Sequence, residues 1–304
     1  MKIYITGSSG FIGSSLINYL LNSQHSLILE TSNNELVTNS KYKKPGVRVV
    51  NFGDNKNRLK YLSECDTVIH LAWSSSPSTR IDQYKDVYEV DILNSISLFN
   101  DCALAGIKKI IFVSSGGTVY GDTGSVALSE EDLTNPVSIY GLNKLTIERY
   151  LKIFSDENSI TSIIVRPSNI YGDPGRNGTP KGAIATWTHN ALKGKSIDFW
   201  GEIDTVRDYL YMDDFLDFLD CVLHYNKSNI FNVGTSIGLS RTQIVEKIKK
   251  VLEGCDIHIN YIKNYVREVE SIKLNIDKAK KELGWSPSTS IEQGIMSIKK
   301  NFYK

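Results

Sequence analysis

Apolar runs alternate with helical patterns along the first half of the chain. Short runs rich in β-branched residues occur at Lys2–Ile5, Ser26–Leu29, Val47–Val50, Thr67–Ile69 and Lys109–Val113. After the first run, apolar residues recur at helical spacing from Phe11 to Leu21. Strands that alternate with helices favour a parallel sheet with helices on both faces. We therefore predict an α/β fold: a Rossmann-type doubly wound parallel sheet with a smaller α/β lobe.

A glycine-rich turn separates the first predicted strand from the first predicted helix. Gly7 permits the tight turn, Gly10 lets the backbone approach a pyrophosphate, and Gly13 lets the helix pack on the strand. The positive helix N-terminus attracts the phosphates. We assign a dinucleotide site to this turn, with the contributing residues Gly7, Ser9, Gly10, Phe11 and Ile12.

An acidic residue follows each of the second and third predicted strands. Glu30 stands where NAD sites place an acid that binds the ribose 2′-hydroxyl, which favours NAD. The small polar side chains from Thr31 to Asn34 suit a 2′-phosphate, so NADP stays open. Asp54 follows Gly53 and is either a partner for the adenine amino group or a turn residue.

A tyrosine and a lysine four residues apart, Tyr140 and Lys144, carry the candidate chemistry. On a helix these positions share a face, so the ammonium can stabilise the phenolate and also reach a bound ribose. A free tyrosine titrates near ~10, so its use as a base near neutrality needs about 4 kcal/mol of such stabilisation. The alternative is an ordinary surface pair, but the upstream glycine turn favours proton transfer coupled to hydride transfer.

Composition and charge argue against several classes of protein. The 304 residues carry a net charge of +1, which gives no sign of a nucleic-acid or membrane surface. No apolar run approaches the length of a membrane helix, and Met1 opens directly onto the first strand. The four cysteines lack Cys-x-x-Cys spacing and are typical of a reduced, cytoplasmic protein. His70 has no clustered Cys, Asp or Glu around it, so we predict no metal site.

Ordered motifs extend over nearly the whole length. They are Thr-Gly-x-x-Gly-Phe-Ile-Gly (6–13), His-Leu-Ala (70–72), Ser-Ser-x-x-Thr-Val-Tyr-Gly (114–121), Tyr-x-x-x-Lys (140–144), Arg-Pro-Ser-Asn-Ile-Tyr-Gly (166–172), Val-Arg-Asp-Tyr (206–209), Phe-Asn-Val-Gly (231–234) and Glu-Leu-Gly-Trp (282–285). With these motifs the chain resembles the extended short-chain dehydrogenase/reductase superfamily, and within it the nucleotide-sugar epimerases typified by UDP-galactose 4-epimerase.

The resemblance implies further site residues. Leu71, Ala72 and Ser114 would join Tyr140 and Lys144 at the cofactor. A nucleotide sugar would be held by Asn169, Arg207, Arg267 and Glu270, of which the arginines suit phosphate. Phe199 and Trp200 would stack on the base, unless they belong to the core. The resemblance also implies a homodimer and a role in polysaccharide biosynthesis.

One position departs from the family pattern. Gly116 stands where the family usually has a catalytic Ser or Thr. If the strand continues regularly, residues 116 and 118 point the same way, so we predict that the Thr118 hydroxyl binds the sugar 4-oxygen. The related dehydratases carry an Asp-Glu pair where this chain has Gly117 and Thr118, which argues against dehydration.

We expect residues 1–167 plus about 203–235 to bind the dinucleotide, and about 168–202 plus 236–304 to bind the nucleotide sugar, with the active site between the two. The loop at 172–178 opens the second lobe, Asp213–Tyr225 is an amphipathic helix, and a helix at Ile276–Leu283 closes the chain. The predicted function is 4-epimerisation of a UDP-hexose or UDP-N-acetylhexosamine. The alternatives are a 4-ketoreductase that consumes NADH or NADPH and, least favoured, a non-catalytic dinucleotide-binding protein.

Overall fold

The chain forms two compact units. The computed structural model describes residues 1–33, 36, 38–122, 124, 126–172, 180–200, 205–253, 255–262 and 269–303. The first unit comprises Met1–Ser114, Ile139–Val165 and His224–Ile230, and the second comprises Ser115–Ser138, Arg166–Leu223 and Phe231–Lys304. No helix in the described part of the chain is both long enough and apolar enough to cross a membrane.

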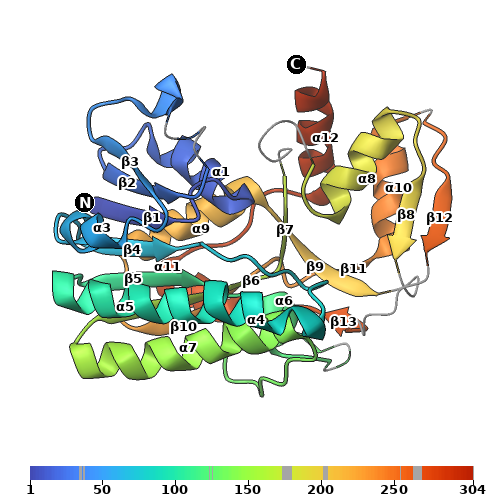
Figure 1. Ribbon diagram of the computed structural model, residues 1–304. Helices are drawn as coiled ribbons and strands as arrows, with labels where there is room; N and C mark the ends of the chain where they lie inside the picture. Colours follow the sequence, from blue (N-terminus) through green and yellow to red (C-terminus); the bar gives the residue numbers. More distant parts are fainter. Residues whose placement is uncertain are drawn as a thin grey trace. The chain divides into compact units, whose positions relative to one another are not determined.

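A seven-stranded sheet, most of which belongs to the first unit, has the order β10-β6-β5-β4-β1-β2-β3 (Figure 1). Its strands are β1 (Lys2–Thr6), β2 (Ser26–Thr31), β3 (Val47–Asn51), β4 (Thr67–His70), β5 (Lys109–Val113), β6 (Thr161–Pro167) and β10 (Asn229–Val233). The pairs from β3 to β6 are all parallel. The order reverses between β1 and β4, which is the switch point where such sheets bind ligands. The predicted doubly wound fold is confirmed.

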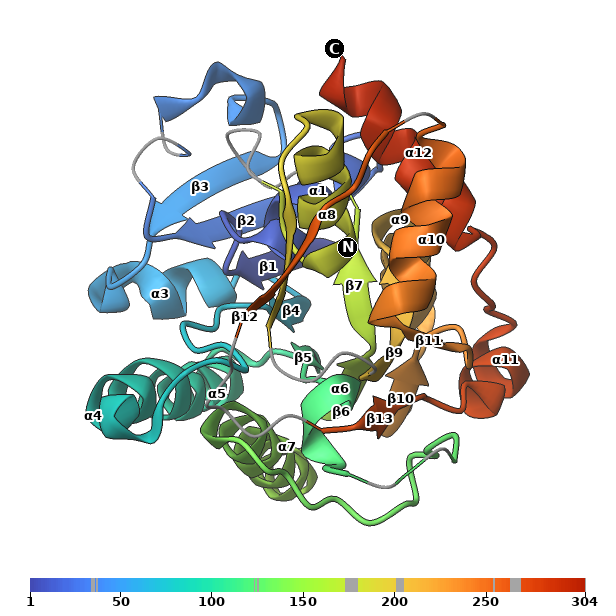
Figure 2. The same cartoon turned by 90° about the vertical axis from the view of Figure 1, so that its right-hand side faces the viewer.

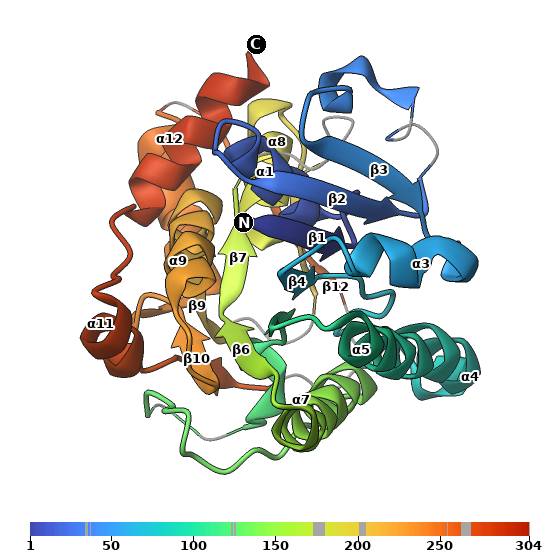
Figure 3. The ribbon, with the colours of Figure 1, turned by 90° about the vertical axis from the view of Figure 1, so that its left-hand side faces the viewer.

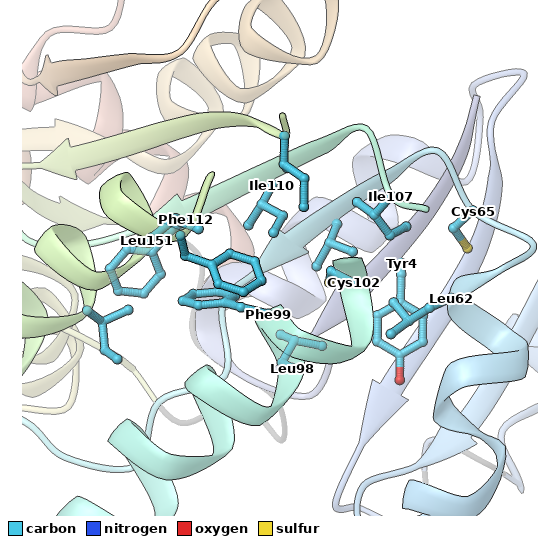
Figure 4. Packing of buried hydrophobic residues seen from close by; sticks show 14 of the residues in the cluster. Tyr4, Leu62, Cys65, Leu98, Phe99, Cys102, Ile107, Ile110, Phe112 and Leu151 are labelled. Carbon is cyan, nitrogen blue, oxygen red and sulfur yellow. The ribbon is translucent and has the colours of Figure 1, made fainter. Parts of the chain in front are cut away.

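Helices cover both faces of this sheet. In Figure 1, α5 and α7 run along one face and α1 lies on the other, and α5 and α7 also lie side by side in Figure 3. The helical segments of this unit are α1 (Phe11–Leu20), η1 (Ser40–Tyr42), α3 (Asn55–Leu62), η2 (Ile81–Gln83), α4 (Tyr84–Val87), η3 (Tyr88–Leu93, a π-helix), α5 (Asn94–Ala105) and α7 (Ile139–Asn158). Between α5, α7 and the strands lies an apolar core that includes Phe99, Phe112 and Leu151 (Figure 4).

The second unit is built around the central strand β9 (Val206–Tyr211). It pairs with β7 (Asn169–Tyr171), β11 (Gly238–Ser240) and β13 (Ser271–Ile272), and a separate parallel pair consists of β8 (Ile197–Trp200) and β12 (Ile259–Ile262). The helices are α6 (Gly116–Val119), α8 (Ala183–Leu192), α9 (Met212–His224), α10 (Arg241–Val251), α11 (Asp277–Leu283) and α12 (Ile291–Phe302). Figure 2 shows α8, α10 and α12 packed together beside β8 and β12.

Three expectations about elements and boundaries need correction or comment. By their contacts, the described residues of 115–138 and 205–223 lie in the second unit, whereas we expected both segments in the dinucleotide-binding lobe. The segment after β5 is the helix α6 and not a continued strand. The helix α11 matches the predicted one, but α12 follows it and closes the chain. Which lobe binds which ligand stays a prediction.

Candidate active site

The turn between β1 and α1 requires glycine at positions 7 and 13. Gly7 has φ +66°, and a Cβ atom there would lie 2.6 Å from the Ala72 nitrogen. A Cβ on Gly13 would lie 2.2 Å from the Gly7 carbonyl oxygen, so α1 packs directly on the turn. No described side chain caps the N-terminus of α1, which begins at Phe11. Its first backbone N–H groups therefore suit an anion such as a pyrophosphate.

A cavity of about 400 Å³ opens beside this turn, within the first unit. Its walls come from the turn, from the ends of β2 and β4, and from η3 and α5. The lining residues are Thr6, Gly7, Ser9, Gly10, Glu30, Thr31, Ser32, Phe52, Arg58, His70, Leu71, Ala72, Trp73, Ser74, Val90, Asp91, Asn94 and Leu98. Glycine backbone at one wall and a buried acid at another match the requirements of a dinucleotide.

Glu30 lies in the wall of this cavity as a buried carboxylate. Its Oε1 accepts a hydrogen bond of 3.0 Å from the Tyr4 hydroxyl. Burial raises the pKa of Glu30, while the Tyr4 hydrogen bond and the Arg58 charge oppose that shift. Arg58, which the sequence did not single out, is held by Asp101 and by Ser97. Its guanidinium is thus already engaged at this end of the cavity.

Several predicted cofactor residues do not line the cavity. The Asp54 carboxylate accepts hydrogen bonds of 3.0 Å from the Asn57 amide at the start of α3, which fits the turn interpretation. The Ser114 hydroxyl donates to the buried Glu148 carboxylate. Phe11 and Ile12 begin α1, as expected. Their roles toward a cofactor stay predictions.

His70 is a structural residue at the end of β4. Its ring bonds to the Thr6 hydroxyl at 2.8 Å and to the Ser95 hydroxyl at 2.9 Å. Burial, together with the nearby Lys144 charge, lowers the pKa of His70 to about 3, so the ring is neutral at physiological pH. Thr6 in turn accepts from the backbone N–H groups of Leu71 and Ala72, which fixes this wall of the cavity. Among the described residues, no group of His, Cys, Asp and Glu forms a metal site.

Tyr140 and Lys144 lie on the first two turns of α7, as predicted. Lys144 is only 4% exposed, and its ammonium donates a hydrogen bond of 2.8 Å to the Val113 carbonyl oxygen at the end of β5. The ammonium lies 5.9 Å from the centre of the Tyr140 ring. Burial outweighs the opposing charges of the Asp91 and Glu148 carboxylates and lowers the pKa of Lys144 to about 7. The Lys144 amine, which lies near the Tyr140 phenol, therefore gains or loses its proton close to neutral pH.

A buried carboxylate, Asp91, supports this region and was missed by the sequence analysis. It is 1% exposed and lies in the π-helix η3, a form that is frequent at functional sites. Its two oxygens accept hydrogen bonds from the backbone N–H and hydroxyl groups of Ser74 and Ser75. No local motif signals this contact, because the serines and the acid are brought together only by the fold.

The second unit contains the predicted Thr118. It lies on α6, so residues 116 and 118 do not share a strand face, and the alternation argument was wrong. Within the described part of the chain, the Thr118 hydroxyl is buried and has no hydrogen-bond partner. Asn169 lies close by, since its Oδ1 atom is 3.1 Å from the place of a Cβ on Gly117. The structure thus brings Asn169 to the start of α6.

The predicted phosphate residues are only partly brought together. An Arg207 guanidinium nitrogen donates to the Val206 carbonyl at 2.9 Å and reaches the Glu270 carbonyl at 3.4 Å. The pairing of β9 with β13 produces this neighbourhood. Arg267 lies outside the described residues, as does the loop from Asp173 to Gly178.

Phe199 was expected to stack on a base, but its side chain is fully buried. Its ring centre lies 5.0 Å from that of Trp187 and 6.0 Å from that of Tyr261. Since the ring belongs to the core of the second unit, it offers no surface to a ligand. The stacking prediction was wrong for this residue, and the side chain of Trp200 lies outside the description.

The chain belongs to the NAD dependent epimerase/dehydratase family, whose profile matches residues 3–234. It is 32% identical to a dTDP-4-dehydro-6-deoxyglucose reductase from Escherichia coli, over 98% of this chain and 96% of that protein. Two solved structures are also similar over nearly the whole length. One is a UDP-glucose 4-epimerase from Thermotoga maritima with UDP-glucose, with 28% identity and a TM-score of 0.89 over 100% of this chain and 99% of that one. The other is a UDP-glucuronic acid 4-epimerase from Bacillus cereus with UDP-glucuronic acid and NAD, with 26% identity and a TM-score of 0.87 over 99% and 100%.

Proposed function

We propose that this protein is an NAD-dependent nucleotide-sugar 4-epimerase that acts on a UDP-hexose or a UDP-N-acetylhexosamine. The observation that carries the proposal is the buried Lys144 ammonium, which is anchored on Val113 and lies near the Tyr140 ring. The cavity with its glycine turn and the buried Glu30 fits NAD, and the similar solved epimerases support the reaction class.

Tyr140 is the proposed acid–base group. Its phenolate takes the proton of the sugar 4-hydroxyl and later returns a proton to the same oxygen. NAD, when bound in the cavity that Gly7, Gly10 and Glu30 line, would supply the hydride acceptor for C4. The Lys144 charge stabilises the phenolate, and Thr118 donates a hydrogen bond to the 4-oxygen. Asn169, Arg207, Arg267 and Glu270 are the proposed contacts to the nucleotide diphosphate.

A 4-ketoreductase is the second candidate. The 32% identical Escherichia coli protein is named as a reductase of a nucleotide 4-keto-6-deoxysugar. In that reaction Tyr140 acts once, as the acid that protonates the 4-oxygen. Thr31 and Ser32 line the cavity beside Glu30, so NADP is the alternative cofactor for this candidate.

One experiment separates the two candidates. The cofactor released from the purified protein on denaturation is identified, and the intact protein is incubated with UDP-glucose or UDP-N-acetylglucosamine without added cofactor. Epimerisation followed by NMR, with NAD retained, supports the first candidate. Oxidation of added NADH or NADPH by a 4-keto-6-deoxysugar nucleotide, without epimerisation, supports the second.

A homodimer is proposed as the working form. The helices α5 and α7 lie side by side in Figure 3, and each carries an exposed apolar side chain: Leu104 is 76% exposed and Ile153 is 62% exposed. A subunit contact that covers these two helices would bury both side chains. Light scattering of the purified protein tests this, and Leu104→Glu with Ile153→Glu should yield monomers. We place the enzyme in the cytoplasm, where its free cysteines stay reduced, and its product in polysaccharide biosynthesis.

A further inference from the structure

An indole ring joins the two residues of the proposed acid–base pair. The Lys144 ammonium lies 3.8 Å from the centre of the Trp73 ring, closer than to the ring of Phe112, at 4.9 Å. The Tyr140 ring meets Trp73 edge to face, with centres 6.4 Å apart and an interplanar angle of 87°. Trp73 also forms part of the cavity wall. One side chain therefore touches the cation, the phenol ring and the cofactor cavity.

The position of the indole is fixed from its other side. The Trp73 Nε1–H donates to the Ser75 hydroxyl at 2.8 Å, and this hydroxyl donates to Asp91 at 2.6 Å. The backbone N–H of Ser75 donates to the same carboxylate oxygen at 3.1 Å. These bonds tie the indole to the buried Asp91 carboxylate of η3.

We propose that Trp73 is a positioning residue for the reaction: its ring face holds the Lys144 ammonium, and its contact with the Tyr140 ring sets the orientation of that ring. The proposal rests on the proposed function, because it assigns a role relative to Tyr140 and Lys144. A ring face attracts a cation through its quadrupole, and this attraction grows where water is excluded.

The carboxylates near Lys144 are engaged by serine residues, whereas the Trp73 ring contacts the ammonium directly. Asp91 on η3 and Glu148 on α7 favour the ammonium through their charge, and His70 on β4 is neutral. Asp91 already accepts four hydrogen bonds from Ser74 and Ser75, and Glu148 accepts one from Ser114. The direct contacts described for the ammonium are thus the Val113 carbonyl and the aromatic rings.

The test compares Trp73→Leu with Trp73→Phe. Leucine keeps an apolar side chain but removes the ring face, whereas phenylalanine keeps a ring. Titration of Lys144 is followed in the protein without added substrate by NMR of ¹³Cε-labelled lysine, with Lys144→Met to assign the signal. Trp187→Leu, the same substitution in the core of the second unit, is the matched control.

We expect Trp73→Leu to lower the pKa of Lys144 by about half a unit or more, since the charged form loses its ring contact. The acid limb of the kcat profile should move to higher pH, because the phenolate is less stabilised, and kcat should fall by about tenfold with KM for the nucleotide sugar within about threefold. Trp73→Phe should restore most of each quantity, and Trp187→Leu should leave the Lys144 titration unchanged.

An unchanged or raised Lys144 pKa in Trp73→Leu overturns the proposal, as does an unchanged pH profile. Failure of Trp73→Phe to restore either quantity overturns it as well. The NMR titration needs no turnover, so it tests Trp73 even if the wild-type protein epimerises and reduces no nucleotide sugar. That last result would instead count against the proposed function.

Discussion

The Tyr4 hydroxyl donates a hydrogen bond of 3.0 Å to the Glu30 carboxylate in the wall of the cavity. This bond fixes the direction of the carboxylate without occupying both of its oxygens. A carboxylate held in this way accepts from a ribose 2′-hydroxyl and repels a 2′-phosphate. The contact gives a physical basis for a preference for NAD over NADP.

Substitution of Glu30 by Gln tests this preference. Glutamine keeps an acceptor for Tyr4 but removes the charge, so we expect NADH binding to weaken by about tenfold, or about 1.4 kcal/mol. NADPH binding should change less, since the repulsion of its 2′-phosphate is lost at the same time. Both affinities are measured by fluorescence titration. Glu64→Gln, the same change in a carboxylate that pairs with Arg48 at the surface, is the control. An unchanged ratio of the two affinities would assign Glu30 to structure alone.

The stability difference between the wild type and Glu30→Gln should depend on pH. Burial raises the pKa of Glu30 above its unfolded value, so the ionised carboxylate costs stability at pH values above the folded pKa. That cost disappears as the pH falls through the raised pKa. The thermal midpoint of apo Glu30→Gln should therefore exceed that of the wild type at neutral pH, and the difference should shrink in acid. A difference that is constant with pH would contradict the assignment.

Tyr140→Phe should abolish turnover while the affinities for substrate and cofactor stay within a few-fold. The hydroxyl that transfers the proton is lost, whereas the ring contact with Trp73 remains. General acid–base groups contribute about 10²- to 10⁴-fold to the rate. Tyr150→Phe on the same helix, whose ring packs against Phe99, should leave the rate unchanged. A Tyr140→Phe enzyme with more than a tenth of the wild-type rate refutes the role.

Lys144→Met should weaken cofactor binding and move the activity profile to higher pH. Methionine fills the buried space but brings no charge to the phenol, so the phenolate forms only at higher pH. Lys152→Met, an exposed position on α7, is the matched control. Binding is measured by calorimetry and the profile by initial rates. An unchanged profile together with intact binding would leave Lys144 a structural residue.

The sequence predicted the first unit well because its signals are local. The strands β1 to β5 are short apolar runs. Only glycine fits at position 7, where the turn meets Ala72, and at position 13, where α1 packs on the turn. The spacing of Tyr140 and Lys144 needs only one helix, so it was predictable as well.

The missed features depend on contacts between distant segments. Asp91 meets Ser74 and Ser75 only because η3 packs beside the loop after β4. Thr118 was misplaced on a strand because its neighbours Gly117 and Val119 give no helical signal, whereas Gly116 packs against Leu274 and the Arg166 carbonyl and α6 begins there.

Gly116→Ser, which would restore the hydroxyl usual in the family, should damage the fold. An added Cβ would lie 2.6 Å from the Leu274 Cδ1 atom and 2.9 Å from the Arg166 carbonyl oxygen. Overpacking of this kind costs about 1–3 kcal/mol. Gly117→Ala is the control, since its added Cβ meets only the Asn169 side chain within about 3 Å, and denaturant unfolding should show a smaller loss. A Gly116→Ser protein of wild-type stability would mean that α6 shifts freely.

Thr118→Val separates a catalytic hydroxyl from a structural one. Among the described residues the Thr118 hydroxyl has no partner, although a buried unpaired polar group costs about 1–3 kcal/mol. Valine keeps the β-branched shape, so the unfolding free energy should stay equal or rise. Turnover should nevertheless fall by at least about tenfold, or about 1.4 kcal/mol in the barrier, because the sugar 4-oxygen loses its donor. Stability is read from denaturant unfolding and turnover from initial rates at saturating substrate. A more stable protein with a lower rate assigns the hydroxyl to substrate, and wild-type turnover assigns the 4-oxygen to another donor such as Ser115.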